Sequence, residues 1–92
     1  MSDSADASHE LIGRQVVIDA DGLYIFLGTL TGQDSHYLIL EDADVHDLRD
    51  TATSRELYVL ESRRHGIRVN RRRVLIRRDE VVSLSALDDV LD

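Results

Sequence analysis

The chain has 92 residues and a mass of 10.4 kDa, which is enough for one small domain with a single core and excludes a second folding unit. It contains no cysteine, so disulfides, thiolate chemistry and cysteine-based zinc sites are excluded. With 42% hydrophobic residues, 32% charged residues and a net charge of −7, the composition is that of a globular protein. We expect a cytoplasmic location without a membrane span or a secretory signal.

Charge is distributed unevenly along the chain. Residues 1–50 carry eleven acids and two arginines, whereas residues 51–92 carry seven acids and nine arginines. All eleven basic residues are arginine, and eight of them lie between Arg63 and Arg78 with no acid among them. Such a stripe is able to bind phosphate or to stack on bases at short range. Alternatively, the acidic run from Glu41 to Asp47 forms cross-strand ion pairs with these arginines.

The first half of the chain predicts a short helical turn followed by a hairpin. Residues 1–7 are small, polar and acidic, which predicts a flexible tail. Ser8 is a candidate cap for a helical turn that ends at Gly13. β-branched residues predict a first strand over 16–18, and the Asp-Gly pair within 19–22 predicts a turn into a second strand over 23–31.

Two glycines and a polar turn shape the next region. Gly28 inside the second strand, followed by Gly32, predicts a strand that curls around a small barrel. A third strand is expected over 36–45, with Leu38 and Leu40 on one face and Ile39, Glu41 and Ala43 on the other.

The pattern becomes helical after residue 47. A capping box from Thr53 to Glu56 predicts the start of a helix, and Gly66 predicts its end. The helical insertion is therefore expected within about residues 48–68. Strands are expected over 72–77 and 81–84, and the C-terminal tail is expected to add one helical turn.

Together these elements predict a mainly β fold. We expect a small, strongly bent, five-stranded SH3-like open barrel over residues 8–92, with an N-terminal helix and a helix inserted between strands 3 and 4. The second, fourth and fifth strands carry consecutive apolar residues, so both of their faces need cover. Pairing the open edges head to tail between copies of the chain would provide that cover in a closed ring.

Two segments resemble the signatures of the Sm and Sm-like (LSm, Hfq-related) proteins. Residues 28–34 followed by Leu38-Ile39-Leu40-Glu41-Asp42-Ala43 resemble the first signature, and residues 74–84 resemble the second. The resemblance implies an Sm-like barrel assembled through its fourth and fifth strands into a homo-oligomeric ring of six or seven copies. It also implies that the ring binds single-stranded RNA.

The base pocket of that family departs from its usual pattern here. The loop after Asp34 offers His36 and Tyr37, and the signature asparagine is absent whichever end of the loop is aligned. Arg77 matches the signature arginine, but Arg78 stands in place of the glycine. Following the resemblance, the candidate RNA-binding residues are Asp34, His36, Tyr37, Arg77 and Arg78, with possible phosphate contacts at Arg71, Arg72 and Arg73.

Each of these candidates also has a structural interpretation. Tyr37 could pack against a neighbouring subunit, with His36 a solvated loop residue, and Arg77 could pair with Asp34 or with a carboxylate of the next subunit. Asp42, Asp44 and His46 alternate along a strand as a metal site would require, although a solvated acidic face fits them better. We therefore expect no metal and no cofactor.

The sequence offers no catalytic motif, so an enzyme is not expected. The leading hypothesis is an Sm-like ring protein that binds single-stranded RNA without catalysis. The alternative is an Sm-fold oligomeric scaffold whose inserted helix contacts a protein partner through Leu57, Tyr58 and Leu60, with no RNA binding.

Overall fold

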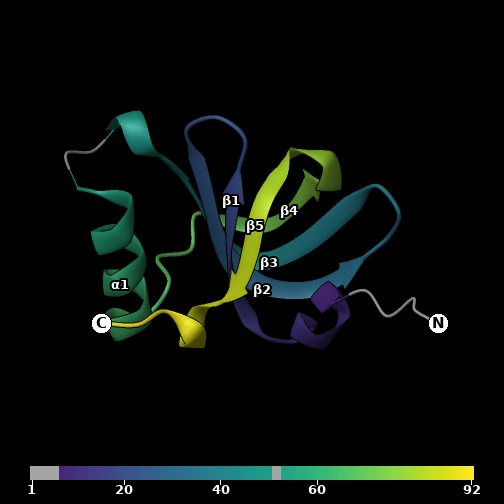
Figure 1. Cartoon of the computed structure of the whole chain (residues 1–92), viewed down its shortest axis with the longest axis horizontal. Helices are drawn as coiled ribbons and strands as arrows, with labels where there is room; N and C mark the ends of the chain where they lie inside the picture. The colour runs from purple at the N-terminus through teal and green to yellow at the C-terminus, as the bar shows by residue number, and fades with distance from the viewer. Residues whose placement is uncertain (1–6, 51–52) are drawn as a thin grey trace.

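The computed structural model describes residues 7–50 and 53–92, and it contains one bent antiparallel sheet with a helix beside it (Figure 1). The sheet has the strand order β4-β3-β2-β1-β5. Its strands are β1 (Gln15–Ala20), β2 (Tyr24–Gln33), β3 (Tyr37–Asp47), β4 (Arg71–Arg77) and β5 (Val81–Ala86). The helices are α1 (Arg55–His65) and the short 3-10 helices η1 (Ala7–Leu11), η2 (Leu48–Asp50), η3 (Arg78–Glu80) and η4 (Leu87–Asp89). The expected five-stranded mainly β fold is confirmed, whereas all of the expected flexible tail except Ala7 lies outside the described residues.

The predicted bend of the second strand is confirmed at both glycines. The pairing of β2 with β3 shifts register between Leu27 and Thr29 and again between Leu30 and Gly32. A Cβ atom added to Gly28 would lie 3.1 Å from the Cα and Cβ atoms of Ala43. Because that distance is shorter than an ordinary contact, the close approach of β2 and β3 favours glycine at this position.

The predicted alternation of β3 is wrong at Ala43. Asp42 has a positive φ of 49°, which interrupts the regular strand geometry. Ala43 therefore lies buried in the same cluster as Leu38 and Leu40, although the simple period of two placed it on the opposite face.

The strands bury side chains in two separate clusters. One cluster fills the inside of the bent sheet and consists of Val16, Ile18, Leu30, Leu38, Leu40, Ala43 and Ile76. The other consists of Val17, Ile25, Leu27, Val59 and Leu87, so it includes residues of β1, β2, α1 and η4. Three consecutive residues of β1 are buried because successive side chains enter different clusters.

Helix α1 begins one residue later than the capping box predicted. The Ser54 hydroxyl, rather than that of Thr53, accepts the hydrogen bond from the Leu57 amide at 3.2 Å. Gly66 follows the helix with a φ of 95°, and its amide donates to the Ser62 carbonyl at 2.8 Å, as the glycine stop predicted. With eleven residues, several of them charged, α1 does not qualify as a membrane-spanning helix, and neither does any other helix of the described chain.

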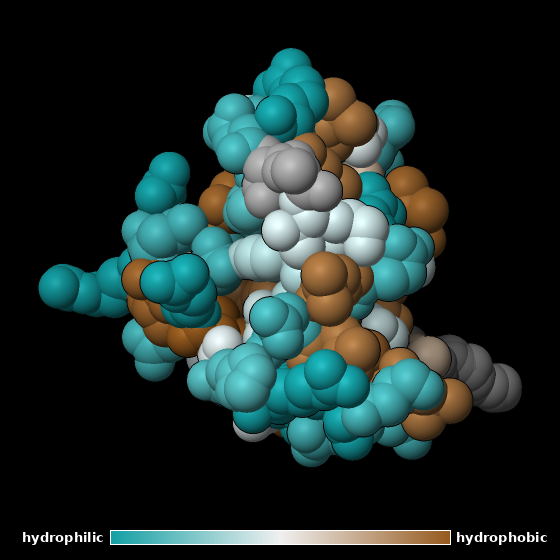
Figure 2. Space-filling model, turned by 90° about the vertical axis from the view of Figure 1, so that its left-hand side faces the viewer, coloured by the Kyte–Doolittle hydropathy of each residue, from teal (hydrophilic) through white to brown (hydrophobic). Residues whose placement is uncertain are grey.

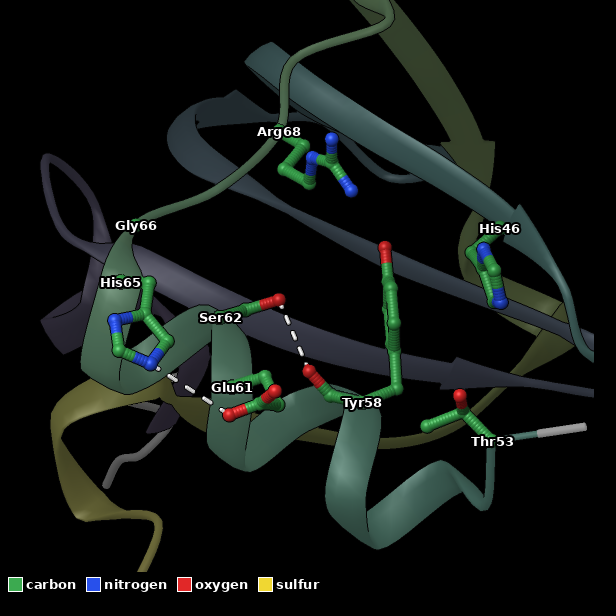
Figure 3. Close-up of a pocket in the computed structure, with 8 residues that line it drawn as sticks. All are labelled: His46, Thr53, Tyr58, Glu61, Ser62, His65, Gly66 and Arg68. Atoms are coloured by element: carbon green, nitrogen blue, oxygen red, sulfur yellow. Dashed lines mark hydrogen bonds and ion pairs between the residues drawn. The ribbon is translucent and has the colours of Figure 1, made fainter. Parts of the chain in front are cut away.

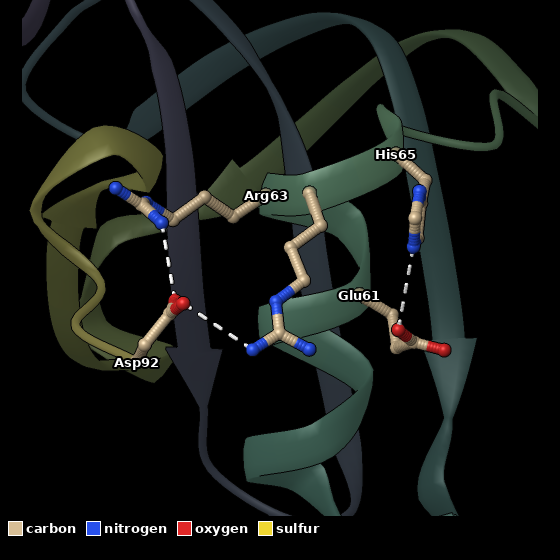
Figure 4. A network of polar contacts seen from close by, with 5 residues as sticks. Glu61, Arg63, His65 and Asp92 are labelled. Atoms are coloured by element: carbon tan, nitrogen blue, oxygen red, sulfur yellow. Dashed lines mark hydrogen bonds and ion pairs between the residues drawn. The ribbon is translucent and has the colours of Figure 1, made fainter.

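Both ends of the described chain are held by polar contacts. Ser8 lies inside η1, and its hydroxyl donates to Gln33 Oε1 at 2.8 Å, so it ties η1 to the end of β2. The predicted N-terminal helix is thus a 3-10 helix. At the other end, the Asp92 carboxylate accepts hydrogen bonds from Arg63 and Arg64, each at 3.2 Å (Figure 4). The predicted C-terminal helical turn is present as η4.

Candidate nucleic-acid interface

The loop between β2 and β3 is organised by Asp34. Its Oδ1 atom accepts hydrogen bonds from the backbone amides of His36 at 2.8 Å and Tyr37 at 2.7 Å. These two bonds lower the pKa of Asp34, because they stabilise the ionised carboxylate. The turn leaves His36 and Tyr37 exposed, with 36% of the surface of Tyr37 accessible.

Arg78 joins this loop to the connection between β4 and β5. Its Nη1 atom donates to Gln33 Oε1 at 2.8 Å and to the Asp34 carbonyl at 3.2 Å. The Arg78 amide also donates to the His36 carbonyl at 2.8 Å. A glycine at position 78 would retain the amide contact but not the two guanidinium contacts. Arg78 therefore positions the loop, and Asp34 does so from within it.

Tyr37 lies directly opposite Arg77 in the pairing of β3 with β4. The Arg77 side chain is 62% exposed, and its Nη2 atom donates to Asp79 Oδ2 at 2.7 Å. The alternative in which Arg77 pairs with Asp34 of its own chain is therefore wrong. We call His36, Tyr37 and Arg77 the loop surface, since the fold brings all three together with their side chains exposed.

Arg71, Arg72 and Arg73 lie at the other end of β4. At about 3.3 Å per residue, Arg71 is about 20 Å along the strand from Arg77. Arg73 lies opposite Glu41 in the sheet register. Within residues 7–50 and 53–92, however, no ion pair joins any of these three arginines to an acid of β3. The predicted cross-strand ion pairs are therefore wrong for Arg71, Arg72 and Arg73.

A second polar cluster lies where α1 meets the sheet, and it consists of Asp44, His46, Tyr58 and Asn70. The Tyr58 hydroxyl donates to Asp44 Oδ2, and Asn70 Nδ2 donates to Asp44 Oδ1 at 2.9 Å. Asp44 is 6% exposed, and its burial raises the pKa of the carboxyl group. We call these four residues the helix junction, because they connect β3, α1 and the segment that precedes β4.

The helix junction contradicts the expectation of a solvated acidic face. The rings of His46 and Tyr58 stack at a centroid distance of 4.0 Å, and both line a cavity of about 480 Å³ (Figure 3). Asp44 is buried whereas Asp42 is exposed, so the expected solvated acidic face is wrong at Asp44. In the part of the chain that the structure describes, no three histidine, aspartate or glutamate side chains are grouped as a metal site requires.

The residues proposed for contact with a protein partner are separated by the fold. The Tyr58 side chain points inward to Asp44 and His46, so it does not belong to the outer surface of α1. Leu57 is 47% exposed, and with Leu60 it lines a groove of about 600 Å³ that also includes Val90 and Leu91. On the face that carries α1, hydrophobic residues form separate patches divided by hydrophilic ones (Figure 2).

Sequence reasoning missed two residues that organise these sites. Gln33 Oε1 accepts hydrogen bonds from both Ser8 and Arg78, so one amide group connects η1 to η3. Asn70 Oδ1 accepts from the Val45 amide at 3.0 Å in addition to its contact with Asp44. Both contacts join residues at least 25 positions apart, and no local pattern around Gln33 or Asn70 indicates them.

Solved structures with a similar fold come from Sm proteins. An Sm protein from Pyrococcus abyssii, determined in complex with a uridine heptamer, matches with a TM-score of 0.61 and 21% identity, over 92% of this chain and 99% of that one. An Sm-like protein from Archaeoglobus fulgidus matches with a TM-score of 0.61 and 15% identity, over 94% and 96% of the two chains. The SmAP1 heptamer of P. aerophilum matches with a TM-score of 0.53 and 20% identity, over 89% and 96%.

These similarities confirm the Sm-like fold that the two strand signatures indicated. No family model matches the chain, and no curated protein matches it in sequence. The feature shared with these structures is thus the arrangement of the five bent strands.

Proposed function

We propose that this protein forms an Sm-like ring that binds single-stranded RNA without catalysis, using His36, Tyr37 and Arg77 of each copy. The observation that carries the proposal is the exposed Tyr37 ring directly opposite the exposed Arg77 side chain. The fold shared with an archaeal Sm protein that was solved with a uridine heptamer supports RNA as the ligand. A cytoplasmic location remains a prediction.

The chemistry of the loop surface suits unpaired nucleotides. An aromatic side chain that stacks on a base contributes about 1–3 kcal/mol, and every base has a face on which to stack. Arg77 supplies a charged group for phosphate or for a base edge. Because the family's asparagine is absent, we expect weak discrimination among bases.

Ring assembly is proposed from the free edges of the sheet. β4 and β5 are the two terminal strands of the sheet order, so each leaves one row of backbone groups without a strand partner among the described residues. Leu75 on β4 is 49% exposed, and Val82 on β5 is 73% exposed. Pairing β4 of one copy with β5 of the next would satisfy both backbone rows and cover apolar surface. The P. aerophilum protein of the same fold is a heptamer, so we propose six or seven copies.

The RNA proposal is tested by fluorescence anisotropy with short uridine-rich and adenine-rich strands at low salt. We expect both strands to bind, the affinity to fall steeply as salt rises, and Arg77→Glu to abolish binding. Arg14→Glu, an exposed change between η1 and β1, reverses the same charge at a residue outside the loop surface and is the matched control. Unchanged affinity in Arg77→Glu, or no binding of either strand by the parent protein, would refute the proposal.

The second candidate function is a scaffold that contacts a protein through α1. The exposed Leu57, beside the groove that Leu60 also lines, is the observation that favours it. A contact through apolar side chains is expected to change little with salt, unlike RNA binding through arginines. The salt dependence of complex formation therefore separates the two functions.

A further inference from the structure

Two exposed groups of opposite charge lie at matching ends of the edge strands. The first, here called the arginine end, consists of Arg71, Arg72 and Arg73 at the start of β4. The second, here called the acidic end, consists of Asp88 and Asp89 in η4, directly after β5. All five side chains are exposed.

Neither group is neutralised by another residue that the structure describes. Arg71 donates to the carbonyl of the adjacent Asn70, and no acid among the described residues pairs with Arg71, Arg72 or Arg73. Asp92, in contrast, already pairs with two arginines of α1, whereas Asp88 and Asp89 pair with no described residue. Three adjacent positive charges repel one another, as do two adjacent negative charges. Each group therefore lacks the counter-charge that the other carries.

The fold determines how these ends meet between copies. The chain runs along β4 into the three-residue η3 and then back along β5, so the two strands point in roughly opposite directions (Figure 1). Rotation about a ring axis preserves the component of a strand along that axis. β4 of one copy therefore runs antiparallel to β5 of the next, and the start of β4 lies beside the end of β5.

We propose that the arginine end of each copy binds the acidic end of the next copy, as a charged clamp beside the paired edge strands. This inference rests on the ring assembly proposed above. Full antiparallel pairing of a seven-residue strand with a six-residue strand brings Arg71 next to Ala86. Asp88 and Asp89 follow within three residues, which is within reach of an arginine side chain.

The clamp also defines the direction of assembly. In an antiparallel contact between two β4 edges, each arginine end would lie beside Arg77 of the other copy. In such a contact between two β5 edges, each acidic end would lie near Asp79 and Glu80 of the other copy. Both arrangements bring like charges close, whereas the head-to-tail contact brings opposite charges together. The clamp thus favours a closed ring over a symmetric pair of chains.

Charge reversal tests the clamp. The first variant changes Arg71, Arg72 and Arg73 to Glu, the second changes Asp88 and Asp89 to Arg, and the third combines all five changes. Glu10→Arg, an exposed reversal on η1, is the control. Mass is measured by light scattering after gel filtration over a range of protein and salt concentrations, and circular dichroism verifies that each variant is folded.

We expect each single-sided variant to raise the concentration needed for assembly at least tenfold at low salt. The combined variant should recover most of that loss, and the control should assemble like the parent. An oligomeric parent whose assembly withstands both reversals would overturn the clamp but not the ring. Loss in each variant without recovery in the combined one would also overturn the clamp. A monomeric parent would overturn both.

The same variants decide whether the arginine end binds RNA instead. If assembly is unchanged while Arg71, Arg72 and Arg73 reversal weakens RNA binding in the anisotropy assay, these residues contact phosphate and the clamp is wrong. If RNA affinity per assembled ring is unchanged while assembly is lost at low protein concentration, the clamp is supported.

Discussion

The two ends of strand β3 each combine an aspartate with a tyrosine, yet they serve different purposes. At the loop end, Asp34 accepts bonds from two backbone amides, and Tyr37 is exposed. At the helix junction, Asp44 accepts bonds from side chains, and Tyr58 points inward to reach it. The same pair of residue types forms a candidate ligand surface at one end and a structural anchor at the other.

The environments of the two aspartates explain this difference. Asp34 is exposed, and its amide donors lower its pKa, so the loop is held by a charged group that water also solvates. Asp44 is buried, and desolvation raises its pKa, so its hydrogen-bond donors offset the cost of burial. Asp34 accepts hydrogen bonds from backbone amides, so the side chains of its neighbours His36 and Tyr37 stay available to a ligand. Asp44 instead accepts hydrogen bonds from the side chains of Tyr58 and Asn70, which are then not available.

The largest difference is expected when the two tyrosines are truncated. Tyr58→Ala should lower the free energy of unfolding by about 3 kcal/mol, because it removes the stacking on His46 and the hydrogen bond to Asp44. Tyr37→Ala should leave stability nearly unchanged but weaken RNA binding by roughly 1–3 kcal/mol. Urea unfolding and anisotropy measure the two effects.

Tyr58→Phe is the matched control, since it retains the stacked ring and removes the hydroxyl. The comparison between the two ends of β3 fails if Tyr58→Ala loses RNA affinity while its stability is normal. It also fails if Tyr37→Ala unfolds as readily as Tyr58→Ala.

A smaller effect is expected from Arg78, which holds the loop end. Arg78→Ala removes the guanidinium contacts to Gln33 and to the Asp34 carbonyl, which should cost about 1 kcal/mol of stability. Amide hydrogen exchange should increase at residues 34–37 and remain unchanged at α1. Arg63→Ala, which removes one contact to Asp92, is the control at the other end of the molecule. Unchanged exchange in the loop would show that Arg78 does not position it.

The smallest effect is expected from the titration of Asp44. Burial raises its folded pKa above the ordinary value of 3.8, so folding favours the protonated form. Its contribution to stability is therefore greatest below pH 3.8 and decreases as pH rises through the folded pKa. Asp44→Asn should be more stable than the parent at pH 7, and the two should converge in acid.

Asp47 provides the opposite case. A hydrogen bond from Arg49 lowers its pKa to about 2, so its stabilising contribution is present above pH 3.8 and is lost as pH falls toward 2. Asp47→Asn should therefore lose stability relative to the parent at pH 7 and approach it at pH 2. Parallel pH profiles for the Asp44 and Asp47 variants, measured by urea unfolding, would contradict the assigned environments.

Much of the fold was predictable because its signals are local. Gly28 and Gly32 indicated the bend of β2, Gly66 indicated the end of α1, and runs of β-branched residues indicated strands. Each of these preferences depends on the conformation of one residue and its near neighbours. The capping box located the start of the helix to within one residue for the same reason.

The residues of the loop surface could also be identified from the sequence, because the resemblance to the Sm signatures indicated His36, Tyr37 and Arg77 as candidates. The internal roles of Asp34 and Arg78 were not, because the guanidinium of Arg78 reaches a side chain 45 positions earlier.

The succession of strands along the chain, the bend of β2 and the helix inserted between β3 and β4 follow from patterns within short segments. Tertiary structure decided which tyrosine is exposed and which arginines have no acidic partner among the described residues. Exposure and ion pairing depend on what the fold places within a few ångströms, and Asp44, Tyr58 and Asn70 meet across 14 and 26 positions of sequence. No interaction between near neighbours along the chain carries that information.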